Sequence, residues 1–196
     1  YLLTGSQDPL HHPLLPCMVE VYYRLGVRQM LIAYNLNNAA GGGCHDDDPG
    51  LSAFGREVIA EMNRVGMVLD LSHTGCRTTL EAMAVSSAPV IFSHSNARGL
   101  CDHERNITDE QIVACAATGG MVGVTGIGLF LRPGGATVDN LVRHIDHMCG
   151  LIGPARVGIS LDYSFNTDGF DLEDGEAFWP ARQYADKGRT EERRVG

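Results

Sequence analysis

The stretch MVLDLSHTGCRTTLEAMAVSSAPVIFSH, residues 67–94, decides the fold of this chain. It opens with the apolar run MVLDL and closes with the apolar run PVIF, and Ser-His follows each run. The segment between the two runs, CRTTLEAMAVSS, predicts a helix. A strand, a helix and a second strand in this order predict a βαβ unit of a parallel sheet.

The same alternation extends outward in both directions. Apolar residues recur at helical spacing over residues 51–66, where Ser52 is suited to capping the helix and Gly66 to ending it. Thr108 followed by Gln111 predicts a capping box for a later helix. The chain also contains the predicted helices LLPCMVEVYYRLG, TDEQIVACAATGG and TVDNLVRHIDHMCGLIG and the predicted strands YLLTG, VRQMLIAYN, MVGVTGIG and RVGISLD.

Two α/β architectures can be built from such units. A doubly wound sheet usually binds its ligand at a G-x-G-x-x-G turn or a P-loop, and the sequence contains neither. A (β/α)8 barrel takes its functional groups from the carboxyl ends of several strands. Polar residues follow most of the predicted strands, namely Gln7, Tyr34, Asn35, His73, His94 and Asp162. We therefore predict an α/β protein with a (β/α)8 TIM barrel.

His73 and His94 are the strongest candidates for metal ligands. One predicted helix separates them, which places them on neighbouring parallel strands about 4.8 Å apart. Two imidazoles at that separation can meet at one metal, with metal–nitrogen distances of about 2.0–2.1 Å. The alternative is that each is a hydrogen-bonded structural histidine at a strand end. Two such residues in register, with Asp162 after a later strand, favour the metal site.

Two further residues are candidates for the same face of the barrel. Asp162 is either a metal ligand or a general base for a water activated by the metal, and its structural alternative is a cap on the following loop. Arg105 lies on the long loop after His94 and could bind a substrate carboxylate through two hydrogen bonds. An arginine on a polar loop can equally be an exposed residue without a specific role.

Other candidates are weaker. His144 and His147 lie three apart on a predicted helix without H-E-x-x-H spacing, so we predict that both are solvated surface residues. His45 and the acidic residues 46–48 do not match a calcium loop and predict a flexible acidic loop. Cys76 is expected in the first turn of a helix, as a packing residue. No G-x-S-x-G elbow is present, which weakens a serine hydrolase.

Composition excludes several classes of protein. A formal net charge of −9 and the absence of clustered Lys and Arg before the carboxyl terminus argue against nucleic-acid binding. Six cysteines without a C-x-x-C pair do not form the pattern of a disulfide framework. No apolar stretch approaches the roughly 20 residues of a transmembrane helix. The compartment stays open, with the cytoplasm favoured.

Four stretches resemble the membrane (renal) dipeptidase family of zinc metallopeptidases, in its bacterial branch. They are EVYYRLGVRQMLIAYNLNN, GLSAFGREVIAEMNRVGMVLDLSHTG, PVIFSHSNARGLCDHERNITDEQI and RVGISLDYSF. The resemblance covers the chain up to about residue 170 and is most specific over residues 51–111. It implies a (β/α)8 barrel of the amidohydrolase type and hydrolysis of dipeptides, including those with a D-residue at the carboxyl end.

The resemblance also implies roles for individual residues. His73 and His94 match two histidine ligands of the family's dizinc centre. Arg105 matches the arginine that binds the carboxylate of the substrate. Asp162 matches the aspartate that handles the proton of the nucleophilic water, and Tyr34 stands where the family has a histidine that stabilises the oxyanion.

The chain departs from the family pattern at its start. The H-x-D metal ligands of the first strand are absent, so we expect a fragment with about strands 3 to 8, forming one partial barrel domain over residues 1–196 with an irregular segment at 171–196. Gln7 stands in place of the bridging glutamate, so the number of zinc ions, one or two, stays open. The unpaired edges of such a barrel invite association, including a homodimer.

The expected partner is a small dipeptide, and two alternatives remain open. One is a non-catalytic relative that keeps the pocket as a small-molecule binding module, which Gln7 and Tyr34 favour. The other is a different amidohydrolase activity, on a lactone or a cyclic amide.

Overall fold

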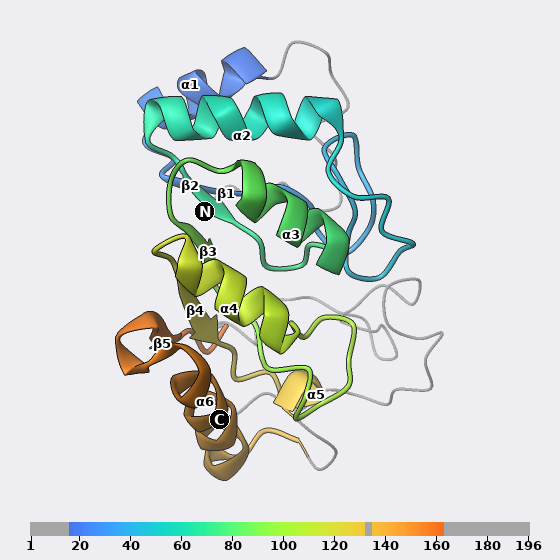
Figure 1. The fold of residues 1–196 in the computed structure, drawn as a ribbon, viewed down its shortest axis with the longest axis vertical. Coiled ribbons are helices and arrows are strands. Elements are labelled where there is room, and N and C mark those ends of the chain that lie inside the picture. The colour runs from blue at the N-terminus through green and yellow to red at the C-terminus, as the bar shows by residue number, and fades with distance from the viewer. Residues whose placement is uncertain (1–15, 132–134, 163–196) are drawn as a thin grey trace, which may run out of the picture.

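The computed structural model describes residues 16–131 and 135–162 of the chain. A five-stranded parallel sheet lies at its centre, and the strands follow one another in chain order (Figure 1). They are β1 (Gln29–Leu31), β2 (Val68–Asp70), β3 (Val90–Phe92), β4 (Met121–Val124) and β5 (Val157–Ile159). A doubly wound sheet reverses its order at a switch point. The unbroken order of these strands is instead that of a barrel segment.

Helices connect the strands and pack against one another in chain order. Figure 1 shows α2, α3, α4 and α6 as a row that runs along the sheet. The helices are α1 (Pro16–Arg24), α2 (Ala53–Val65), α3 (Cys76–Val85), α4 (Asp109–Ala117), α5 (Gly128–Leu131), α6 (Val138–Ile152) and the short 3-10 helix η2 (Pro154–Arg156). None of the helices in the described ranges has the length and apolar character needed to cross a membrane.

The hydrophobic core lies between the sheet and the helices. Leu69, Phe92 and Val122 from three neighbouring strands are buried there. Ile59 and Met62 of α2 pack into the same cluster, as the apolar spacing of this helix predicts. Burying a side chain of this size contributes about 1.5–3 kcal/mol. The core therefore covers one face of the sheet and fixes the direction in which the strand ends point.

Local signals mark the helix ends as the sequence predicts. The Ser52 hydroxyl accepts a hydrogen bond from the Gly55 amide at the start of α2, and Gly66 ends this helix with a left-handed φ of 82°. Thr108 and Gln111 form the predicted capping box at the start of α4. Each contact satisfies backbone groups that have no partner inside the helix.

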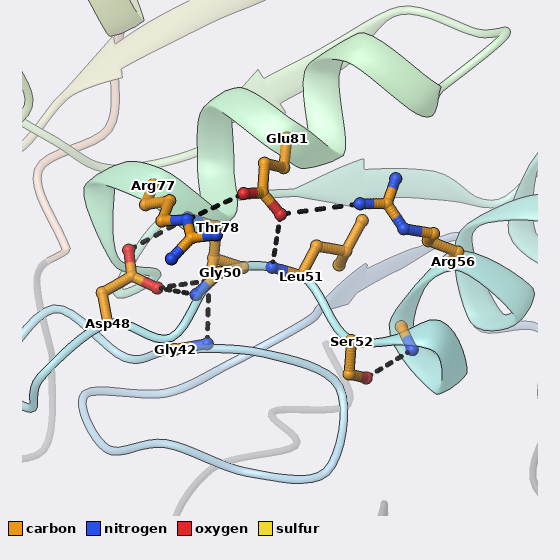
Figure 2. Close-up of polar contacts among 10 residues, drawn as sticks. Gly42, Asp48, Gly50, Leu51, Ser52, Arg56, Arg77, Thr78 and Glu81 are labelled. Atoms are coloured by element: carbon orange, nitrogen blue, oxygen red, sulfur yellow. Dashed lines mark hydrogen bonds and ion pairs between the residues drawn. The ribbon is translucent and has the colours of Figure 1, made fainter.

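Helix α3 is capped by a residue from a distant loop. Gly75 occupies its N-cap position and offers no side-chain hydrogen bond. The carboxylate of Asp48 accepts instead from the Thr78 amide at 2.9 Å and from the Thr78 hydroxyl (Figure 2). A Cβ atom on Gly75 would lie 2.3 Å from Asp48 Oδ2, so only glycine leaves room for this carboxylate.

A second carboxylate fastens the same loop to α3. Glu81 accepts from the Leu51 amide at 2.9 Å and from Arg77 Nε at 2.8 Å (Figure 2). Asp48 also accepts from the Gly50 amide at 3.0 Å. The prediction of a flexible acidic loop at residues 45–48 is therefore wrong for Asp48, because its carboxylate is bound at several points to the loop and to the helix.

The strands are shorter than predicted. β2 ends at Asp70 and β3 at Phe92, so the histidines that follow lie in loops just beyond the strands. The predicted strand MVGVTGIG ends at Val124, and the short helix α5, which was not predicted, follows it. The predicted strand YLLTG, with Gln7 after it, and the segment 171–196 lie outside the described residues.

Candidate active site

His73 and His94 lie side by side beyond the carboxyl ends of β2 and β3. These two strands are adjacent and parallel. The Nε2 atoms of the two rings are 2.8 Å apart, and the ring centroids are 4.9 Å apart. Both side chains are buried. This geometry places the two rings where a single cation can contact both.

Asn35 fixes the orientation of His73. Its backbone amide donates to the His73 carbonyl at 3.1 Å, and its side-chain oxygen lies 2.7 Å from His73 Nδ1. Both residues have a left-handed backbone, with φ of 62° for Asn35 and 66° for His73. An amide oxygen only accepts hydrogen bonds, so the proton of His73 resides on Nδ1. The Nε2 atom of His73 therefore presents a lone pair toward His94.

Ser93 and Asp70 fix His94 in a similar way. The Ser93 hydroxyl donates to Asp70 Oδ2 and lies 2.6 Å from His94 Nδ1. Because its single proton is directed to the carboxylate, the hydroxyl oxygen accepts from His94 Nδ1. The Nε2 atom of His94 then also presents a lone pair, toward His73.

Burial and charge keep both histidines neutral. Burial lowers the pKa of His73 well below its ordinary value, and the nearby charge of Arg105 lowers it further. The pKa of His94 is lowered well below its ordinary value by the same two causes, burial first. A neutral imidazole is the form that binds a metal ion.

The residues present fit a metal ion. Two Nε2 lone pairs that face each other at 2.8 Å repel unless a proton or a metal cation lies between them. Imidazole nitrogens with their second ring nitrogen hydrogen-bonded are the ligand arrangement that zinc sites use. Within residues 16–131 and 135–162, no group of three or more His, Cys, Asp or Glu side chains is placed to hold a metal. The described part of the chain thus offers two candidate ligands, His73 and His94.

Arg105 brings a buried positive charge to the same site. Its guanidinium donates to the His94 carbonyl at 2.7 Å and to the Ser95 hydroxyl at 3.0 Å. Its Nε has no hydrogen-bond partner among the described residues, and none of their carboxylates forms an ion pair with it. A buried charge without a counterion favours an anionic ligand. The sequence predicts a loop residue at this face, and the structure places Arg105 beside the histidine pair.

Tyr34 and Asp162 complete the set of predicted residues. The Tyr34 ring stacks on the His73 ring, with centroids 3.9 Å apart. Burial raises the pKa of Tyr34, the charge of Arg105 lowers it and the charge of Asp162 raises it, so both charges act on this ring. Asp162 is exposed and has a left-handed φ of 55°, just beyond β5. Tyr34 thus contacts His73 directly, whereas Asp162 is linked to the group through the effect of its charge on Tyr34.

The prediction that His144 is a solvated surface residue is wrong. Its side chain is buried, with Nδ1 accepting from the Ala97 amide at 3.0 Å and Nε2 lying 2.6 Å from the Leu131 carbonyl. His147 is partly exposed and binds Asp109 at 2.8 Å. Cys76 lies in the first turn of α3 as predicted but is exposed, so it is not a packing residue.

Sequence reasoning missed the roles of Asp70 and Ser93. Asp70 is a carboxylate at the end of an otherwise apolar strand, and it is completely buried. That unusual position was a usable signal, because a buried carboxylate needs several hydrogen-bond donors. The serine that precedes each histidine, Ser72 and Ser93, was a second signal, because its hydroxyl can bind a neighbouring histidine or carboxylate.

An α/β barrel segment with paired histidines at one rim of its sheet belongs to the class of metal-dependent hydrolases. The sequence model of the membrane dipeptidase family (Peptidase family M19) matches residues 15–178. The chain therefore belongs to the membrane dipeptidase family, a family of metallopeptidases. This confirms the predicted family. Because its members are metallopeptidases, membership implies a metal ion.

Curated relatives are named dipeptidases. An uncharacterized dipeptidase of Schizosaccharomyces pombe is 39% identical over 163 residues, which cover 80% of this chain and 39% of that protein. The dipeptidase verJ of Clonostachys rogersoniana is 36% identical over 151 residues, which cover 76% of this chain and 39% of that protein. The chain thus spans about two-fifths of the length of these relatives.

Solved structures confirm the predicted partial barrel. An amidohydrolase from Pseudomonas aeruginosa has a TM-score of 0.74 and 41% identity, covering 77% of this chain and 47% of the other. A metallo peptidase from Rhodobacter sphaeroides, liganded with a phosphinate mimic of L-Ala-D-Ala, has a TM-score of 0.70 and 29% identity, covering 74% and 45%. The chain therefore corresponds to about half of each of these structures.

Proposed function

We propose that this protein is a zinc-dependent dipeptidase and that His73 and His94 hold the metal. The observation that carries the proposal is the convergence of two buried Nε2 lone pairs at 2.8 Å. Membership of a metallopeptidase family supports it. The pair accounts for one ion. A second ion would need ligands other than these two, and Gln7 offers a neutral amide where a bridging carboxylate would balance charge.

The other site residues take separate roles in this proposal. A bound zinc ion supplies Lewis acidity, which lowers the pKa of water toward about 7. Arg105 binds the carboxylate of the dipeptide, since its buried guanidinium has a donor to spare. The Tyr34 hydroxyl donates to the negative charge that develops on the peptide oxygen. Asp162 accepts the proton of the attacking water and returns it to the leaving amine.

The proposed substrates include dipeptides with a D-residue at the carboxyl end. Support comes from the Rhodobacter sphaeroides metallo peptidase, whose bound ligand mimics L-Ala-D-Ala. Arg105 would bind the carboxylate of either stereoisomer, because a planar guanidinium recognises the carboxylate itself. Selectivity between isomers would then depend on the side chains around the second residue.

The proposal is tested by zinc analysis and hydrolysis of L-Ala-L-Ala and L-Ala-D-Ala by the protein. We expect stoichiometric zinc and turnover, both lost in His94→Ala and kept in His147→Ala, a matched change at a partly exposed histidine of α6. The competing function is a binding module, which the neutral Gln7 and the tyrosine at position 34 favour. Saturable dipeptide binding without turnover in a zinc-loaded protein would establish that function and reject the dipeptidase.

A further inference from the structure

We propose that Asp70 is a positioning residue, which acts through Ser93 to decide which nitrogen of His94 carries the proton. The inference rests on the proposed function, because it concerns the histidine pair proposed to hold the metal. It assigns a task to a carboxylate that contacts neither ring directly. The reasoning starts from the hydrogen bonds around this carboxylate.

Asp70 is completely buried and receives four hydrogen bonds. Oδ1 accepts from the backbone amides of Ser72 at 3.0 Å and Ser93 at 3.1 Å. Oδ2 accepts from Gln29 Nε2 at 2.8 Å and from the Ser93 hydroxyl. Among the described residues no Lys or Arg forms an ion pair with it. These four donors therefore compensate the buried charge, and each must point its proton at the carboxylate.

The direction of the Ser93 hydroxyl follows from this environment. A serine has one proton to donate, and Asp70 takes it. The lone pairs of Ser93 then face two groups, His94 Nδ1 at 2.6 Å and the Ser72 hydroxyl at 3.2 Å, so both of these groups must donate. Nδ1 of His94 consequently carries its proton, and Nε2 is left as the acceptor that faces His73.

The two oxygens of Asp70 have separable tasks. A purely structural carboxylate would serve by joining β2 to β3, and Oδ1 alone does this through the Ser93 amide, while it also accepts from the Ser72 amide of its own segment. Oδ2 contacts two side chains, Gln29 Nε2 at 2.8 Å and the Ser93 hydroxyl, and adds nothing to that backbone link. The contact between Oδ2 and the Ser93 hydroxyl is therefore the one that decides which nitrogen of His94 carries the proton. The isosteric change Asp70→Asn separates the two tasks.

An asparagine can keep its oxygen at the Oδ1 position and place its amino group at Oδ2, where Gln29 would turn its side-chain oxygen toward it to accept. The Ser93 oxygen would then accept from the amide, and its proton would become available to His94 Nδ1. The proton of His94 would move to Nε2, where it points at His73 and blocks the lone pair. Losing an outer partner of a metal-binding histidine typically weakens metal binding about 10–100-fold.

The test uses the full chain, labelled with 15N-histidine and free of metal. Two-bond proton–nitrogen spectra report the tautomer of His94, and competition with a chromophoric chelator gives the affinity for zinc. We expect an Nδ1–H tautomer in the wild type and in Ser93→Thr, which keeps the hydroxyl. We expect the Nε2–H tautomer in Asp70→Asn, with zinc binding about 10–100-fold weaker.

Two further variants keep the test decisive. Ser93→Ala removes only the hydroxyl and should leave His94 without a preferred tautomer, so it decides the matter if Asp70→Asn does not fold. Asp139→Asn makes the same chemical change at an exposed residue of α6 and should alter neither the His94 tautomer nor the zinc affinity. An unchanged tautomer and zinc affinity in the folded Asp70→Asn or Ser93→Ala variant overturn the inference. A wild type with the expected tautomer but no zinc binding overturns only the proposed metal site.

Discussion

Replacing Asp48 with alanine tests whether a loop residue holds α3 and, through it, the loop of His73. Three donors lose their acceptor: the Thr78 amide, the Thr78 hydroxyl and the Gly50 amide. Loss of an N-cap contact costs about 0.5–2 kcal/mol. Leaving partly buried donors without their acceptor costs about 1–3 kcal/mol. We therefore expect the free energy of unfolding to fall by about 1.5–5 kcal/mol.

The measurement is urea unfolding followed by far-ultraviolet circular dichroism. Asp47→Ala is the matched control, because it makes the same change at an exposed neighbour and should shift stability by less than about 0.5 kcal/mol. Weaker zinc binding should accompany the loss in Asp48→Ala, since the Cys44 amide of this loop donates to the His73 carbonyl at 3.0 Å. Equal stability of the two variants would refute the assignment of Asp48 as the cap of α3.

Three further predictions follow from charge and burial. Burial lowers the pKa of His144, so the contribution of this residue to stability is complete above the unfolded pKa of about 6.5 and is lost as the pH falls below that value. Urea midpoints should therefore decline more steeply toward about pH 5 in the wild type than in His144→Gln. Parallel declines would contradict this. Arg105→Met should raise KM for dipeptides about tenfold or more, as loss of a charged hydrogen bond predicts, and leave dipeptide amides unaffected. Burial raises the pKa of Cys115 to about 12, so iodoacetamide at about pH 8 should label this thiol only after denaturation, which mass spectrometry can read.

Local signals explain why much of the fold could be predicted from the sequence. The caps at Ser52 and Thr108 depend on residues within one turn of the helix start, and both form as predicted. The cap of α3 could not be found in this way. Its acceptor, Asp48, lies 30 positions before Thr78, and nothing in the run of three aspartates distinguishes it from its neighbours. Only the folded chain decides which carboxylate reaches the helix.

The error at His144 has a different origin. The residue shares a helical face with Leu141, Ile145 and Met148, which pack against the core, so the periodicity already placed it on the buried side of α6. The polarity of its ring favours a position on the surface only where no hydrogen-bond partner is available inside the protein. The Ala97 amide and the Leu131 carbonyl provide two partners from distant segments. Tertiary contacts therefore reverse an assignment that rested on polarity alone.

The repeated Ser-His motif now has a physical reading in which the two serines differ. Ser72 accepts from the His94 backbone amide at 3.1 Å and has its own proton free for the Ser93 hydroxyl, so it fixes the backbone of the second histidine. Ser93 donates its proton to Asp70 and therefore accepts from Nδ1 of the same histidine, which fixes the tautomer of the ring. Both serines thus act on His94, while His73 depends on Asn35. The similarity of the two motifs in sequence hides this asymmetry, and exchanging Ser72 and Ser93 for alanine should therefore affect the His94 ring unequally, with the larger change in its tautomer from Ser93.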